Sequence, residues 1–270
     1  MRYQRIFEQF FIFFMIILMA SCARKSERHD IIEPSHIQAG DITTEKKIPQ
    51  THKEFLARFL PEIQKANNRI LIQRNKALDI RDTLETDDQL SKFNINELNK
   101  LLLQYRLDRL ESDPPPPAEQ LSSSIQQLLK RADIIPIKLV MAQAIIESGW
   151  GSSKFAKEGN NYFGVHCYTE GCGVKPAGND SAKFFVKTYP SEMAGIEDYL
   201  WILNTGHAYK DLRKTRQELR EEGKNIDALA MARGLESYSI KGEAYVNMVS
   251  NIIKNYIPKD TKTLLGLNQP

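Results

Sequence analysis

Hydrophobic residues recur at intervals of three and four along most of this chain, which predicts a mainly helical protein. The longest such stretch covers residues 53–81, where basic and amide residues fill the positions between the apolar ones. Further helices are predicted at residues 95–110, 121–132, 136–149, 191–203, 211–222, 225–235 and 243–256. Residues 165–189 differ, because they combine glycines with a Phe- and Val-containing run that favours strands. We therefore expect a mainly α (α+β) protein with a small β-lobe.

Four consecutive prolines, Pro114–Pro117, interrupt the helical pattern. A run of this kind forms a stiff and extended spacer. We place a spacer at residues 114–118, between an N-terminal helical region at residues 53–113 and a second unit at residues 119–258. The pattern allows the first region either to pack on the second unit or to move independently of it.

The helix predicted at residues 136–149 is apolar nearly all round, so it belongs inside a core. Pro136 suits its first turn, and Gly149 suits the left-handed position just after its last turn. Glu147 then lies in the last turn, where burial and the negative end of the helix dipole both raise the pKa that we expect for its carboxyl group. A carboxylic acid kept protonated near neutral pH can act as a general acid. The plainer alternative is that Glu147 is half of a structural ion pair.

The charge and composition of the chain argue against nucleic acid as a binding partner. The 270 residues carry a formal net charge of +3, which gives no electrostatic argument for nucleic-acid binding. The aromatic residues do not alternate with basic runs, as they do in proteins that bind single strands. The pattern indicates no cofactor.

The N-terminus indicates export. Arg2 and Arg5 precede an apolar run that ends at Ala20, too short to span a membrane and typical of a secretory signal. Residues 18–22 resemble a lipobox, so we expect removal of residues 1–21 and lipidation of Cys22, which would anchor the chain stably. An ordinary signal peptide is the alternative. By resemblance to lipoprotein sorting rules, we expect a location in the cell envelope, at the outer membrane and facing the periplasm.

Residues 22–52 are polar and read as the lipidated cysteine and a flexible tether, and residues 259–270 read as a C-terminal tail. With Cys22 lipidated, Cys167 and Cys172 remain as a pair, and an exported compartment favours a disulfide between them. His166 beside Cys167 raises a metal site as the competing interpretation. Zinc needs four ligands and no second cluster is present, so we expect no metal.

Two motifs resemble a known family. Residues 142–151, Ala-Gln-Ala-Ile-Ile-Glu-Ser-Gly-Trp-Gly, followed by Asn-Asn-Tyr-Phe-Gly at residues 160–164, are similar to the glucosaminidase family of bacterial cell-wall hydrolases. That family includes the peptidoglycan-cutting domain of the flagellar rod protein. The cysteine loop at residues 167–173 and the helical segments at residues 55–63 and 66–71 resemble its Bax-type branch. The resemblance covers about residues 52–257 and implies a lysozyme-like helical domain with a small β-lobe.

The resemblance also implies site residues. Glu147 corresponds to the catalytic acid of the family, and Tyr238 to a tyrosine that points into the cleft opposite it. The second catalytic group cannot be aligned; Glu170 is our best candidate, and the 2-acetamido group of the substrate could replace it. We expect substrate contacts from Trp150, Asn160, Asn161, Tyr162, Phe163 and Tyr245. Core packing for the aromatic residues, and turn formation for the two asparagines, are the alternatives.

Together these features predict a peptidoglycan hydrolase that is held at a membrane by its lipid anchor. The expected reaction cleaves β-1,4 bonds of the glycan strands as an endo-β-N-acetylglucosaminidase, with Glu147 as general acid. One alternative is a lytic transglycosylase of the same fold, which would leave an anhydro end. The other is a non-catalytic, glycan-binding envelope lipoprotein.

Overall fold

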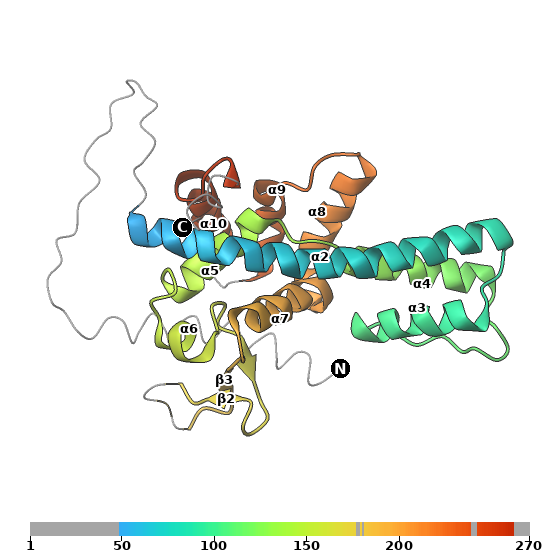
Figure 1. Cartoon of the computed structure of the whole chain (residues 1–270), viewed down its shortest axis with the longest axis horizontal. Coiled ribbons are helices and arrows are strands. Elements are labelled where there is room, and N and C mark those ends of the chain that lie inside the picture. The colour runs from blue at the N-terminus through green and yellow to red at the C-terminus, as the bar shows by residue number, and fades with distance from the viewer. Residues whose placement is uncertain (1–48, 177–178, 180, 239–241, 262–270) are drawn as a thin grey trace, which may run out of the picture.

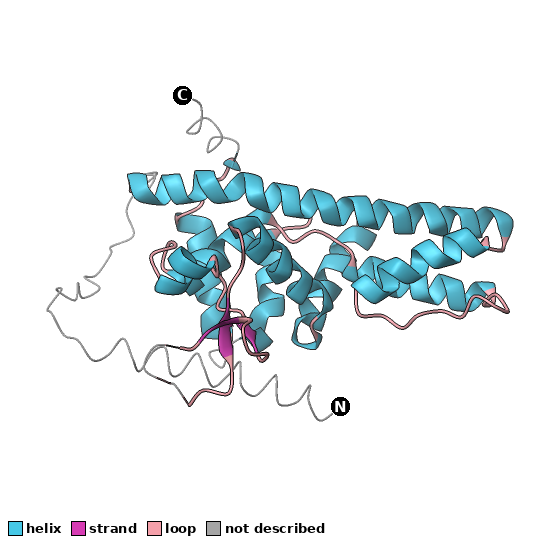
Figure 2. Cartoon of the chain, turned by 60° about the horizontal axis from the view of Figure 1, so that its bottom comes forward, coloured by secondary structure: helices cyan, strands magenta, loops and turns pink. Residues whose placement is uncertain are grey.

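A computed structural model describes residues 49–176, 179, 181–238 and 242–261. The predicted signal peptide, Cys22, nearly all of the tether and residues 262–270 lie outside the described residues. The described chain is mainly helical and carries one small sheet, shown in Figures 1 and 2. The predicted fold class is therefore confirmed. None of the described helices combines the length and the apolar character that a membrane crossing requires.

The helix α2, Gln50–Asp87, runs along the whole length of the molecule (Figure 1). It extends beyond the predicted residues 53–81 at both ends. Apolar side chains from Phe55 to Ile70 enter a main core, whereas Ala77, Ile80 and Leu84 enter a second core. One helix therefore belongs to both cores.

The second core forms where the end of α2 packs against α3, Lys92–Gln104, and α4, Ala118–Arg131. Helix α3 is shorter than predicted, because Arg106 adopts a left-handed conformation after it, with φ of 57°. Asn99 fixes the segment that follows, since its Nδ2 donates to the Leu110 carbonyl at 2.9 Å and its Oδ1 accepts from the Leu110 N–H at 2.7 Å. The proline-containing segment then leads into α4 without helical structure.

The main core surrounds α5, Ile137–Ser148. Every residue from Leu139 to Ile145 is buried, as the apolar pattern of this helix predicts. Helix α5 packs against α2, α9 and α10. The other elements of this part are α7 (Glu192–Thr205), η1 (His207–Tyr209), α8 (Lys210–Glu221), α9 (Ala228–Ala232), η2 (Arg233–Tyr238) and α10 (Glu243–Asn255).

The β-lobe follows the short helix α6, Lys154–Gly159. Its three strands are β1 (His166–Cys167), β2 (Gly173–Val174) and β3 (Phe185–Lys187), arranged antiparallel in the order β1-β3-β2. A side chain at Gly173 would place its Cβ 2.0 Å from the Val186 carbonyl oxygen, so this strand pairing requires glycine. The lobe projects from the helical body below α6 and α7 in Figure 1.

A buried ionic cluster joins the two cores. Asp133, in the connection between α4 and α5, lies 2.9 Å from Arg220 Nη2 and 3.4 Å from Arg74 Nη1. Burial alone would raise the pKa of Asp133, but the Arg220 hydrogen bond and the charges of Arg216 and Arg74 together hold it below its usual range. The cluster therefore fastens α2, α8 and the α4–α5 connection to one another.

Candidate active site

The turn after α5 holds Glu147 in a defined position. Gly149, Trp150 and Gly151 follow it with left-handed backbones, at φ of 57°, 60° and 73°. Ser148 closes the turn, because its Oγ donates to the Ala144 carbonyl and accepts from the Gly151 N–H at 2.8 Å. The motif Glu-Ser-Gly-Trp-Gly thus encodes a helix end that is locked by its own hydrogen bonds.

Gly151 is also required by packing. A Cβ atom at this position would lie 3.1 Å from the Phe55 ring and 3.2 Å from the Tyr162 ring. Helix α2 and the Tyr162 segment therefore approach the turn as closely as its backbone permits. This contact explains why the N-terminal helix and the motif around Glu147 form one core.

Glu147 itself is half-buried and faces buried phenols. Tyr245, from α10, is fully buried and donates its hydroxyl to Glu147 Oε1 at 3.0 Å. Burial raises the pKa of Tyr245 well above its ordinary value, and the neighbouring charges of Glu147 and Tyr199 raise it further. Burial likewise raises the pKa of Tyr209, with a further contribution from Glu147. A buried residue thus fixes one oxygen of the Glu147 carboxyl group by a hydrogen bond.

Tyr245 was expected to contact substrate, but its position argues for another role. Its side chain has no exposed surface on which a sugar could lie. The hydrogen bond to Glu147 instead makes it a support for the candidate acid. Tyr209 and Gln143, which also lie near this carboxyl group or its phenol, were missed from the sequence. Gln143 carried a usable signal, because it is an amide four residues before Glu147 in an otherwise apolar helix.

Trp150 packs against α2 and also borders a hollow at the surface. The His52 ring stacks on its indole, with centroids 3.7 Å apart and an interplanar angle of 2°, so one face of the indole is covered. Trp150 also lines a hollow of about 690 Å³ together with Phe55, Arg58 and other residues of α2. Its predicted contact with a sugar therefore depends on the parts of the ring that face this hollow.

Tyr162 and Phe163 are buried in the main core. The Tyr162 hydroxyl is hydrogen-bonded to Glu192 and accepts from Arg58 Nη1 at 3.3 Å. The Phe163 ring stacks on Tyr199, with centroids 3.9 Å apart. Both rings thus fill the core and connect α2, α7 and the segment after α6, as the packing alternative described.

Asn160 and Asn161 shape the entrance to the β-lobe. Asn160 ends α6 in a left-handed conformation, and its Nδ2 donates to the Tyr189 carbonyl at 2.9 Å. Asn161 is buried and donates to the Val165 and Lys187 carbonyls, each at 2.8 Å. Their amides are therefore engaged with backbone groups, which matches the turn alternative better than recognition of an N-acetyl group.

The remaining predicted residues lie in the β-lobe and in η2. Cys167 and Cys172 form the expected disulfide. Glu170 lies in the exposed turn that this disulfide closes. Tyr238 ends η2, and its side chain lies outside what the structure describes. The roles of Glu170 and Tyr238 stay predictions.

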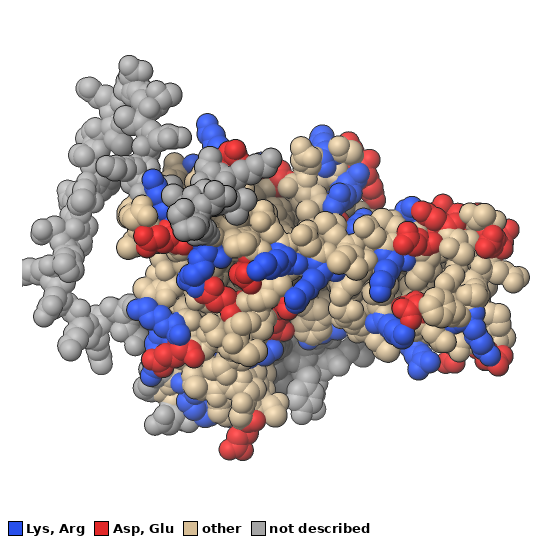
Figure 3. Space-filling view, viewed as in Figure 1, with Lys and Arg blue, Asp and Glu red and all other residues tan. Residues whose placement is uncertain are grey.

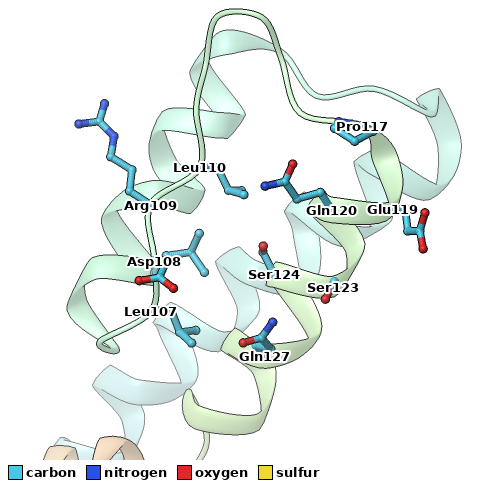
Figure 4. Close-up of a pocket in the computed structure, with 11 residues that line it drawn as sticks. Leu107, Asp108, Arg109, Leu110, Pro117, Glu119, Gln120, Ser123, Ser124 and Gln127 are labelled. Carbon is cyan, nitrogen blue, oxygen red and sulfur yellow. The ribbon is translucent and has the colours of Figure 1, made fainter. Parts of the chain in front are cut away.

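Among the described residues, two kinds of feature could mark a further site: a group of possible metal ligands, and a hollow away from Glu147. No three His, Cys, Asp or Glu side chains gather there into a group that could hold a metal ion. A hollow of about 460 Å³ between residues 107–110 and α4 is bordered by Gln120, Ser124 and Gln127 (Figure 4), and it shares no residue with the surroundings of Glu147. On the face shown in Figure 3, acidic and basic side chains are interspersed.

Comparison with known proteins finds relatives over the part of the chain that contains α5. The family described as "Glucosaminidase: Mannosyl-glycoprotein endo-beta-N-acetylglucosaminidase" matches residues 122–257. The Protein bax of Escherichia coli (strain K12) is 39% identical over 120 residues, which are 44% of this chain and 42% of that protein. The exo-glucosaminidase LytG of Bacillus subtilis (strain 168) is 26% identical over 145 residues, 51% of this chain and 50% of that protein.

The chain thus spans half or less of the length of these two curated relatives. No solved structure gives a significant match. The matched region contains the Glu147 helix, the β-lobe and the helices up to α10. From this match and the shared motifs, we conclude that the chain is a Bax-type member of the glucosaminidase family.

Proposed function

We propose that this chain hydrolyses the β-1,4 glycosidic bonds of peptidoglycan as an endo-β-N-acetylglucosaminidase, with Glu147 as the general acid. The observation that carries the proposal is the setting of Glu147 within the family's matched region. It is half-buried at the end of a buried helix, and Tyr245 holds its Oε1 from the interior at 3.0 Å. We assign the proton that is given to the substrate to the other carboxyl oxygen, Oε2.

In the proposed reaction, Glu147 gives its proton to the glycosidic oxygen while the bond from that oxygen to the sugar C1 breaks. Water supplies the hydroxyl group that C1 gains, and its remaining proton restores the acid. A second group must activate the water or shield the developing positive charge. Glu170, Tyr238 or the 2-acetamido group of the substrate would fill this role.

We also propose that Cys22 carries the lipid and that the enzyme acts at the outer membrane, facing the periplasm. The motif at residues 18–22 and the polar residues after it support this location. Metabolic labelling with an alkyne fatty acid, followed by fractionation of the envelope, tests it. The wild type should take up the label in the outer-membrane fraction, and Cys22→Ser should lose it. A labelled Cys22→Ser protein would contradict the anchor.

The identity of the products tests the reaction. The full chain, purified in mild detergent, would be incubated with peptidoglycan sacculi and the fragments analysed by mass spectrometry. Internal cuts with new reducing N-acetylglucosamine ends support the proposal. Release of single sugars from chain ends would indicate exo action instead, and anhydro-muramic ends would indicate a lytic transglycosylase. Binding of sacculi without any cleavage would support the non-catalytic alternative.

A further inference from the structure

Gln143 lies in the middle of α5, among apolar and buried neighbours. Its side chain has 0% exposure, and neither Nε2 nor Oε1 makes a hydrogen bond with the described part of the chain. A buried amide in this condition lowers folding stability, whereas an apolar side chain of similar size would not. Core packing therefore does not explain why this position holds glutamine.

The position of Gln143 suggests an explanation. It precedes Glu147 by four residues, so both side chains lie on the same face of α5. The Gln143 amide approaches the Tyr245 phenol closely enough to lower the pKa of that phenol, against the stronger effect of burial. Tyr245 in turn donates to Glu147 Oε1 at 3.0 Å. The Gln143 amide, the Tyr245 phenol and the Glu147 carboxyl group thus form a chain of neighbouring polar groups.

Within the described part of the chain, two further titratable side chains act on these three groups. Tyr209 reaches Glu147 from η1, and Tyr199 reaches Tyr245 from α7. Helix α9 has the sequence Ala-Leu-Ala-Met-Ala, and the side chains that α2 buries in this core are apolar apart from Asn67. Asn67 is bonded to the backbone of Ile135, at the far end of α5. Among the described residues, Glu147, Tyr199 and Gln143 are therefore the groups that act on the Tyr245 hydroxyl.

We propose that Gln143 is a positioning residue for Glu147 and acts through Tyr245, an inference that rests on the proposed function. In the substrate-bound enzyme, the Nε2–H group of Gln143 donates to Tyr245 Oη, and this directs the phenolic hydrogen to Glu147 Oε1. Oε2 then keeps the proton that is given to the substrate. Hydrogen bonds of this kind are often long in the free enzyme and tighten when substrate binds, which fits the incomplete contact at Gln143.

The variants Gln143→Met and Tyr245→Phe test this chain of contacts. Each removes a stabilising interaction of the ionised Glu147 carboxylate, so the pKa of Glu147 should rise and the alkaline limb of the pH–rate profile should move upward by about 0.5–1 pH unit. We expect kcat to fall about 3- to 10-fold in Gln143→Met, the effect of one ordinary hydrogen bond, with KM unchanged. Folding stability should stay equal or increase, because an unsatisfied amide is removed.

Two comparisons separate this role from a structural one. In the Tyr245→Phe background, adding Gln143→Met should cost no further activity, because Gln143 acts through the phenol. Gln73→Leu is the matched control: it removes another amide that contacts a tyrosine, Tyr105, in the second core, and it should leave kcat and the pH profile unchanged. If Gln143→Met does not fold, Gln143→Leu takes its place.

The outcomes are distinguishable. An unchanged pH limb and kcat in Gln143→Met, or additive losses in the double variant, would overturn the positioning role. If those results came with an inactive Glu147→Gln, the positioning role alone would fail. If Glu147→Gln retained full activity, the proposed function would fail, and this inference with it. A shifted limb, unchanged KM and non-additive loss would support the inference.

Discussion

The substitution Asp133→Asn should destabilise the whole protein, because Asp133 is the anion of the buried cluster. Arg216 is 1% exposed and Asp133 is 3% exposed, while Arg220 is 41% exposed. Removing the negative charge therefore leaves the buried Arg216 with neutral partners only, namely the carbonyl groups of residues 130, 131, 133 and 134 and Oδ1 of Asn204. The partly exposed Arg220 can return to water.

Breaking a buried ion pair by removing one partner costs about 3–5 kcal/mol. We expect the lower end, about 3 kcal/mol, because Arg216 keeps its carbonyl acceptors and Asn can still accept the Ile134 N–H that Asp133 accepts at 2.8 Å. In a protein of this size, that loss lowers Tm by about 6–12 °C. Thermal unfolding followed by circular dichroism measures it. Asp82→Asn, which removes an exposed ion pair with Arg81, is the control and should change stability by less than about 0.5 kcal/mol.

The same residue predicts the response to acid. The pKa of Asp133 is lower in the folded protein than in the unfolded chain, so the unfolded chain takes up a proton first as the pH falls. The stability from Asp133 is therefore present above pH about 4 and is lost as the pH falls through the folded pKa. The Asp133→Asn variant should show a flatter acid dependence there. A loss below about 1 kcal/mol, or an acid dependence identical to that of the wild type, would refute the reasoning.

Three further predictions concern the β-lobe and its attachment. Replacing Cys167 and Cys172 together by serine should cost about 2 kcal/mol of stability for so short a loop, measured by urea unfolding, and no loss would mean that the lobe is held by other contacts. Gly195→Ala should cost about 1–3 kcal/mol, because its Cβ would lie 2.5 Å from the Asn160 carbonyl oxygen; an unchanged Tm would contradict that packing. Burial lowers the pKa of His166 to about 4, so its imidazole signal in NMR should titrate there, whereas titration near pH 6.5 would indicate an open lobe.

The hydrophobic pattern was a good guide where one face or a whole helix is buried. The all-round apolar pattern of α5 predicted its burial, and the change in composition at residues 165–189 predicted the β-lobe. The pattern understated α2, because the helix continues through polar turns up to Asp87. In residues 82–87 only Leu84 is buried, so the apolar spacing holds too few positions there to mark the end of the helix.

Site residues were harder to predict, because a residue type does not state which way its side chain points. Tyr245 and Phe163 were expected to contact sugar, and both are instead buried, one behind Glu147 and one against Tyr199. Asn161 was expected to bind substrate through its side-chain amide, but that amide donates instead to the backbone carbonyl of Lys187 in β3. These outcomes depend on contacts between distant segments, which the spacing within one motif does not contain.

The central claim is that Glu147 supplies the proton in glycan cleavage. Its most direct test is the rate at which the full chain releases soluble fragments from peptidoglycan, compared between the wild type and Glu147→Gln. Glu158→Gln is the control, since Glu158 is exposed and pairs only loosely with Lys154 at 3.8 Å. The account predicts that Glu147→Gln lowers the rate more than about 100-fold while Glu158→Gln equals the wild type. A Glu147→Gln rate within a few-fold of the wild type would contradict it.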